Sequence, residues 1–363
     1  RPLDLTKPLW EMTVIEGLDS VPGLPEGSYA ILSKFHHACV DGVSGADITE
    51  AIHSLVPNPP KPDAPEKAWR GENDPNPFEL VTRGQFNNLT QPYRFAEVMA
   101  RAVPAMGRFQ KGLLEKKFEV NAVIPRTRFN GVVSSHRVVE GRSFELDEIK
   151  KIKSLVEGAT VNDAVLTIVG GALRKYLESK REAIGDSLVA MAPISVRSEE
   201  GKNAGGNQVA AMTVKLGNDI ADPLQRLAFV HHSASSSKEM TNAVGAKLMT
   251  DFSQFIPATT AALATRLYTE FGMAENVAPA FNCVVTNVPG PQFPLYSAGA
   301  RLVTQYGLGP IQDSMGLIFP VFSYCGNITI TVNACRKMMP DPEFFAACLQ
   351  ESYDELAQMT KPG

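Results

Sequence analysis

A strand-to-helix junction near the beginning of the chain restricts the fold more than any other sequence feature. Residues 29–35 follow Gly27 and combine β-branched and aromatic side chains, which predicts a strand. Ser44 and Asp47 have the spacing of a capping box, and the apolar residues after them recur at helical spacing, which predicts a helix. The residues between these elements, HHACVDG at 36–42, therefore place two imidazoles, a carboxylate and a glycine at a turn.

The two histidines of this junction cannot both serve the same cleft. Neighbouring side chains of an extended backbone point to opposite faces, so we expect one of His36 and His37 to be chemical and the other structural. An imidazole exchanges a proton near neutral pH, which makes a histidine at this turn a candidate general base. A purely structural role for the whole group is the alternative, because polar residues are common in turns.

The heptapeptide matches HHxxxDG, the signature of the acyl-CoA-dependent acyltransferases related to chloramphenicol acetyltransferase and the peptide-synthetase condensation domains. Four other blocks accompany it along nearly the whole chain. They are PLD with PLWE (2–4 and 8–11), NDAVL (162–166), PISVR with GN (193–197 and 206–207) and NVPGP (287–291). In this order the five blocks resemble those of the bacterial wax ester synthase/diacylglycerol acyltransferase family.

The resemblance implies an α/β fold of two mixed-sheet domains of the chloramphenicol acetyltransferase type, with the active site at their interface. The 363 residues also suffice for about two domains, and the predicted strands and helices mix without strict βαβ alternation. We expect an N-terminal acyltransferase domain at 1–56, a proline-rich linker with crossover helices at 57–134, and a C-terminal acyltransferase domain at 135–363. In that family a sizeable segment precedes the block that opens this chain. The N-terminal domain is therefore expected to be incomplete, and a separate N-terminal segment of the same protein is a candidate partner.

The implied activity is O-acyl transfer from long-chain acyl-CoA to a fatty alcohol or diacylglycerol, giving wax ester or triacylglycerol without a covalent acyl-enzyme. The acceptor hydroxyl must lose a proton as it attacks, and the departing thiolate must gain one, so one imidazole can serve both steps. By match to the motif, His37 is the general base and His36 supports it. Acyl-CoA is then a co-substrate, and no bound cofactor is expected.

The same match supplies the further site residues. In related acyltransferases the acid of the motif pairs with an arginine and braces the loop, which implies that Asp41 pairs with Arg197 and that Gly42 forms the turn. The resemblance also implies that Asn162, Asp163 and Asn287 bind substrate or support the active centre. Asp163 has a structural explanation as well, because it completes a capping box that begins three residues earlier.

Other sequence features bear on alternative functions. GVSGA at 42–46 approaches the GxSxG motif of serine hydrolases, but Ala46 replaces the last glycine and capping already explains Ser44. The pair His231-His232 lies in the helical stretch 224–240, lacks a following Asp-Gly, and is predicted to be a solvated or half-buried helix face with no metal. A condensation-type N-acyltransferase and a non-catalytic lipid-binding or lipid-inclusion protein stay open as alternatives. The DFGWG block typical of the wider acyltransferase group is absent.

Composition limits partners and location. A net charge of −4 argues against nucleic-acid binding, and no apolar run approaches the ~18 residues that cross a bilayer. Five cysteines without CxxC spacing indicate reduced thiols and a cytoplasmic protein without structural zinc. Residues 93–118 predict a basic amphipathic helix, kinked at Pro104, that either packs on its own protein or contacts the inner membrane or lipid inclusions peripherally.

Overall fold

A six-stranded mixed sheet organises most of the structure. The computed structural model describes residues 3–4, 6–37, 48–61, 76–115, 117, 124–182, 185–195, 209–244 and 258–361. The strand order is β3-β10-β9-β6-β4-β5. The strands are β3 (Arg137–Glu145), β4 (Val189–Ser195), β5 (Val209–Lys215), β6 (Cys283–Pro289), β9 (Leu317–Tyr324) and β10 (Asn327–Cys335). Because β4, β6 and β9 are parallel neighbours, their carboxyl ends lie at the same edge of the sheet.

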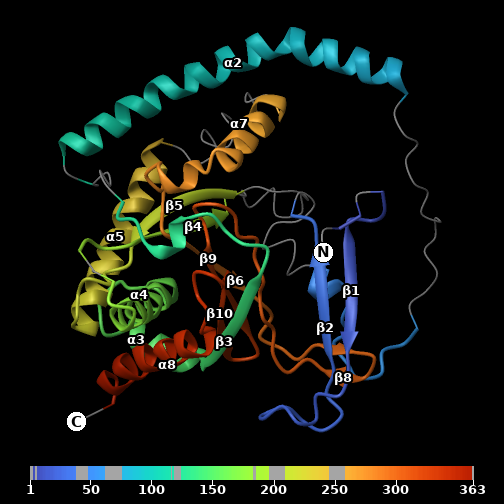
Figure 1. Cartoon of the computed structure of the whole chain (residues 1–363), viewed down its shortest axis with the longest axis vertical. Helices are drawn as coiled ribbons and strands as arrows, with labels where there is room; N and C mark the ends of the chain where they lie inside the picture. Colours follow the sequence, from blue (N-terminus) through green and yellow to red (C-terminus); the bar gives the residue numbers. More distant parts are fainter. Residues whose placement is uncertain are drawn as a thin grey trace.

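Helices cover one face of this sheet (Figure 1). They are α3 (Leu146–Lys153), α4 (Val161–Ser179), α5 (Pro223–Val244) and α8 (Pro342–Met359). Alternate residues of β10, including Ile328, Ile330 and Val332, are buried in the same cluster as the apolar residues of α4. Helix α4 is buried almost all round, as expected of a helix enclosed by a sheet and by helices α3, α5 and α8. It passes so close to the residue after β5 that a Cβ at Gly170 would lie 2.2 Å from the Leu216 carbonyl oxygen.

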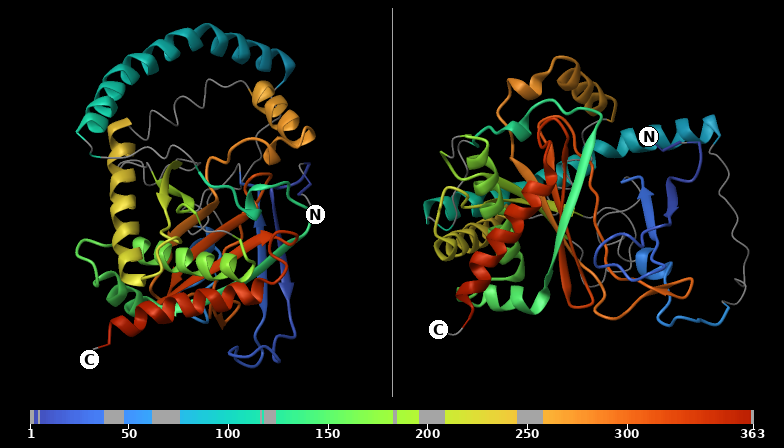
Figure 2. Two further views of the ribbon diagram at one scale, coloured as in Figure 1. Left: turned by 60° about the vertical axis from the view of Figure 1, so that its left-hand side comes forward. Right: turned by 60° about the horizontal axis from the view of Figure 1, so that its bottom comes forward.

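The N-terminal part contributes a separate two-stranded ribbon. Strands β1 (Trp10–Ile15) and β2 (Ala30–Phe35) pair antiparallel, which confirms the strand predicted before the histidines. Figure 1 and the right view of Figure 2 place this ribbon apart from α4 and α8, with the main sheet between them.

A segment that follows β6 connects the two parts of the fold. It contains the short strands β7 (Tyr296–Ser297) and β8 (Ala300–Arg301). Tyr296 exchanges two backbone hydrogen bonds of 2.8 Å with Ser54, and the Tyr29 hydroxyl donates to the Ser297 carbonyl at 2.7 Å. The second half of the chain therefore reaches across to the N-terminal part.

Helix α2 (Pro77–Leu114) differs from the prediction. It begins at Pro77 and not near residue 93, because Asn76 accepts a hydrogen bond from the Glu79 amide at 2.8 Å and Pro77 occupies the first helical position. The helix continues through Pro92 and Pro104 and curves across the molecule as a long arch (Figure 1). It packs on α5, where the Arg108 Nε donates to the Ala243 carbonyl at 3.1 Å. No helix in the described ranges is both long and apolar enough to cross a bilayer.

The remaining elements complete the sheet and its helical layer. Helix α3 ends at Lys153, and β9 and β10 form a hairpin about residues 326–327. Helix α8 begins at Pro342, but the preceding Asp341 forms no side-chain cap. Its carboxylate instead accepts hydrogen bonds from the Tyr176 hydroxyl at 2.7 Å and from Lys180. The shorter elements are α7 (Ala258–Glu270), η1 (Arg128–Asn130) and η3 (Met273–Glu275).

Candidate active site

Three sequence blocks converge at the carboxyl edge of the parallel strands. PISVR begins within β4, NVPGP ends β6, and NDAVL opens α4. The contact that joins the last two is between the Asn287 Nδ2 and the Asn162 Oδ1, which lie 3.5 Å apart. In open α/β sheets ligands bind beyond the carboxyl ends of parallel strands, and a helix N-terminus there offers unpaired N–H groups. The structure therefore forms a candidate substrate edge from residues that are far apart in sequence.

The first turn of α4 is fixed by a reciprocal cap. The Asp163 carboxylate accepts from the Thr160 amide at 2.8 Å, and the Thr160 hydroxyl accepts from the Asp163 amide at 3.2 Å. This confirms the capping box predicted from sequence. Asn162 is half-buried beside it, so the cap sets the direction in which its amide points.

Asp163 has a second partner that the sequence did not indicate. The Nδ1 of His231, on α5, lies 3.0 Å from the Asp163 Oδ2, and the two side chains are 25% and 4% exposed. The predicted half-buried helix face is thus correct for His231, whereas its neighbour His232 is exposed. The pairing was missed because 68 residues separate the partners and only the packing of α5 on α4 brings them together.

The histidines of the motif lie at the end of the β1–β2 ribbon. His36 continues the ribbon with a backbone hydrogen bond to the Leu9 carbonyl at 2.9 Å, and His37 follows in a turn. Both side chains are exposed. The predicted residues Asp41, Gly42 and Arg197, and Ser44 of the hydrolase alternative, lie outside the described residues.

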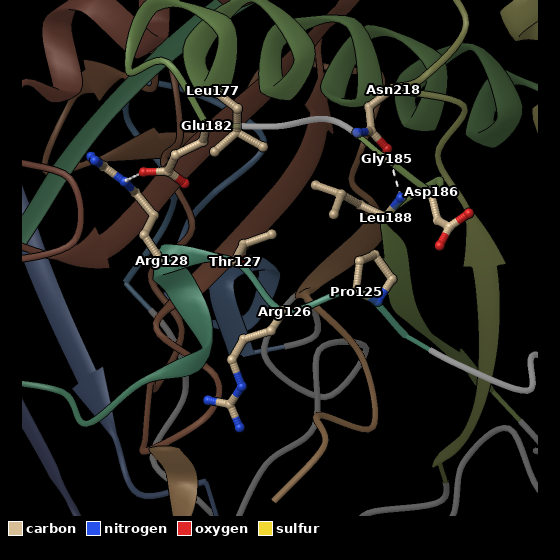
Figure 3. A pocket seen from close by; sticks show the side chains of 10 residues that line it. All are labelled: Pro125, Arg126, Thr127, Arg128, Leu177, Glu182, Gly185, Asp186, Leu188 and Asn218. Carbon is tan, nitrogen blue, oxygen red and sulfur yellow. Dashed lines mark hydrogen bonds and ion pairs between the residues drawn. The ribbon is translucent and has the colours of Figure 1, made fainter. Parts of the chain in front are cut away.

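Two cavities lie away from the edge of the sheet at which Asn162 meets Asn287. One, of about 280 Å³, is at the far end of α4 beside Leu177 (Figure 3). Since 19 helical residues extend roughly 28 Å, it is distant from Asn162. Its Arg128 is paired with Glu182 at 2.5 Å, while Arg126 turns away to backbone carbonyl groups. The other, of about 290 Å³, is an apolar groove between α2, β5 and α5.

Two of the buried thiols, Cys283 and Cys348, are poor nucleophiles. Burial raises the pKa of Cys283 to about 12 and that of Cys348 to about 11, so neither forms much thiolate near neutral pH. Within the described ranges no group of three or more His, Cys, Asp or Glu side chains is arranged to hold a metal ion.

Comparison with known proteins identifies the family. Residues 1–165 match the wax ester synthase/diacylglycerol acyltransferase catalytic domain, and residues 205–357 match the WS/DGAT C-terminal domain. The chain belongs to this family. Among its relatives, tgs2 of Mycobacterium tuberculosis (strain H37Rv), which carries the name of a diacylglycerol O-acyltransferase, is 32% identical over 98% of this chain and 75% of that protein. A second relative, MT1809 of strain CDC 1551, is also named as a diacylglycerol O-acyltransferase. It is 31% identical over 98% of this chain and 69% of its own length.

Solved structures support the fold. The wax ester synthase/diacylglycerol acyltransferase from Marinobacter aquaeolei VT8 superimposes with a TM-score of 0.62 at 23% identity, over 99% of this chain and 73% of that one. The EpoB cyclization-docking bidomain from Sorangium cellulosum gives 0.50 at 10% identity, over 98% and 64%. These findings confirm the predicted family, the two-part mixed α/β fold and the class of enzyme, an O-acyltransferase of the wax ester and triacylglycerol type.

Proposed function

We propose that this enzyme transfers a long-chain acyl group from acyl-CoA to the hydroxyl of a fatty alcohol or diacylglycerol, with His37 as general base. Family membership over both halves of the chain carries the proposal. The convergence of NDAVL, PISVR and NVPGP at one sheet edge supports a substrate site there. In this proposal Asn162, Asp163 and Asn287 form the part of the site that lies at this edge.

The chemistry is a single displacement. The His37 imidazole accepts the hydroxyl proton as the oxygen attacks the thioester carbonyl carbon; the C–S bond then breaks, and the proton passes to the departing thiolate. General base catalysis typically contributes about 10²–10⁴-fold, so the rest of the acceleration comes from holding both substrates together and stabilising the oxyanion. His36 supports the base, Asp41 and Arg197 brace the motif loop, and Gly42 provides its turn.

Side-by-side acceptor assays test the proposal. The purified chain is incubated with radiolabelled long-chain acyl-CoA and, in separate reactions, a fatty alcohol, a diacylglycerol or a long-chain amine. We expect CoA release coupled to ester formation with at least one of the two alcohols. Amide formation alone would favour a condensation-type enzyme, and binding of acyl-CoA without turnover would favour a lipid-binding protein.

We further propose that α2 contacts an anionic lipid surface. Its first half exposes many large apolar side chains, and the whole helix carries five basic and two acidic residues. In the first half the most exposed of these are Phe78, Phe86, Leu89 and Tyr93, each at least 64% accessible. A helix that combines apolar and basic faces binds at the boundary between lipid headgroups and acyl chains.

Vesicle co-sedimentation tests this contact. The chain is expected to sediment with phosphatidylcholine vesicles that contain phosphatidylglycerol, and less with phosphatidylcholine alone, because the basic residues favour anionic lipid. The double substitution Phe86→Ser and Leu89→Ser should weaken binding several-fold. Met359→Ser, at an exposed apolar position on α8, is the matched control. Equal binding by the α2 variant and the control would exclude α2 as the contact.

The β1–β2 ribbon is the second candidate contact surface. One of its faces presents Trp10, Met12 and Val14, which are 54%, 38% and 59% exposed. A two-stranded ribbon is only marginally stable alone, so we propose that an N-terminal segment of the same protein packs on this face. Extending the chain before residue 1 with the corresponding segment of tgs2 should then raise the thermal unfolding midpoint; an unchanged midpoint would exclude this role.

A further inference from the structure

The strongest unexplained feature of the candidate active site is the pair formed by Asp163 and His231. Asp163 is already satisfied as a capping residue by the Thr160 amide, so helix formation alone does not require a second partner. The same carboxylate oxygen, Oδ2, nevertheless lies 3.0 Å from the His231 Nδ1. Because a carboxylate accepts hydrogen bonds and cannot donate them, Nδ1 carries the proton and donates it to Asp163.

The other side of the imidazole is closely confined. Gly158 lies against it, and a Cβ built on that glycine would be 3.3 Å from the His231 Nε2. Gly158 also has a φ of +80°, a conformation that residues with side chains rarely adopt. The turn before α4 therefore leaves room for this ring, and a side chain at position 158 would crowd its Nε2.

Asp163 connects His231 to the substrate edge. The next residue toward the N-terminus, Asn162, approaches Asn287 at the end of β6. A helix turn is rigid over so short a distance, so a side chain that fixes Asp163 also fixes the direction of Asn162 and of the first N–H groups of α4. His231 belongs to α5, which packs on α4 without contributing a family block to this edge.

We propose that His231 is a positioning residue for acyl transfer. Through Asp163 it holds the first turn of α4 so that Asn162 and the helix N-terminus meet the substrates in a fixed orientation. This inference rests on the proposed function of the α4 edge. His231 does not touch the reacting atoms, and its effect is on the alignment of groups that do.

Three substitutions on one helix separate positioning from packing. His231→Ala removes the donor and is expected to lower kcat/KM by about 10-fold to 100-fold, the usual effect of losing a hydrogen bond to a charged group. His231→Asn places an amide N–H near the position of Nδ1 and should recover most of the activity. His232→Ala, at the exposed neighbour, is the control and should behave as wild type.

A readout independent of activity accompanies the kinetics. Amide hydrogen exchange at residues 161–164 should be faster in His231→Ala than in wild type, and close to wild type in His231→Asn. Wild-type activity in His231→Ala, an equal defect in His231→Ala and His231→Asn, or unchanged exchange at these amides would each overturn the proposal. If the wild-type enzyme itself transferred no acyl group, the proposed function would fail, while the exchange data would still test the connection between His231 and α4.

Discussion

His37→Ala is expected to lower kcat for acyl transfer by about 10²–10⁴-fold, the usual contribution of a general base. The substitution should leave KM for acyl-CoA and for the acceptor within a few-fold of wild type, because the imidazole acts on the proton that moves during the reaction. Steady-state assays of CoA release with the preferred alcohol measure both parameters. Since His37 lies on an exposed turn, the variant should fold as well as wild type.

His36→Ala is the matched control for this substitution. It removes an adjacent, equally exposed imidazole from the end of the same strand. Removal of a supporting residue should lower kcat much less than removal of the base. We therefore expect the loss of kcat in His36→Ala to be at least 10-fold smaller than in His37→Ala. If His36→Ala were the more damaging change, the two roles would have to be exchanged. Full activity in both variants would exclude a histidine base from this motif.

The largest effect on stability is expected for Gly170→Ala. A methyl group at this position would lie 2.2 Å from the Leu216 carbonyl oxygen and 3.1 Å from its carbonyl carbon. Neither side can yield easily, because α4 is buried almost all round and the Leu216 amide is hydrogen-bonded to the Leu188 carbonyl at 2.8 Å. Overpacking in a core typically costs about 1–3 kcal/mol, and a clash with backbone places this variant at the upper end.

Urea unfolding measures this loss as a lower midpoint with an unchanged slope. The matched control is Gly107→Ala, the same substitution inside helix α2, where the added methyl group meets nothing within 4 Å apart from its chain neighbours and the nearby backbone of its own helix. There the better helix propensity of alanine should leave stability unchanged or raise it by up to about 1 kcal/mol. A midpoint for Gly170→Ala equal to that of wild type would mean that α4 can move away from the residue after β5 without any loss in the free energy of unfolding.

Local sequence signals predicted local structure well. The strand before the histidines and the capping box of Thr160 and Asp163 each depend on residues close in sequence. The order of the sequence blocks predicted the family and, through it, the fold. It also placed Asn162 and Asn287 in one site, and the structure brings these two side chains into contact.

At two carboxylates the sequence did not reveal every partner, because distant residues bind there as well as or instead of local ones. Asp341 directly precedes α8, where a carboxylate can cap a helix. Its carboxylate instead accepts hydrogen bonds from Lys180 and Tyr176. Asp163 keeps its cap and still accepts from His231, a partner that no local pattern could reveal. The start of α2 was mispredicted for another reason. Asn76 and Pro77 are a typical helix start, but they follow a proline-rich stretch that favours an extended chain.

The two backbone hydrogen bonds between Ser54 and Tyr296 affect how such enzymes can diversify. These two hydrogen bonds join main-chain groups, so replacement of either side chain by any residue other than proline leaves them possible. Substitutions at these two positions can accumulate without loss of the two bonds. The placement of one half against the other can therefore be inherited while the side chains at positions 54 and 296 change.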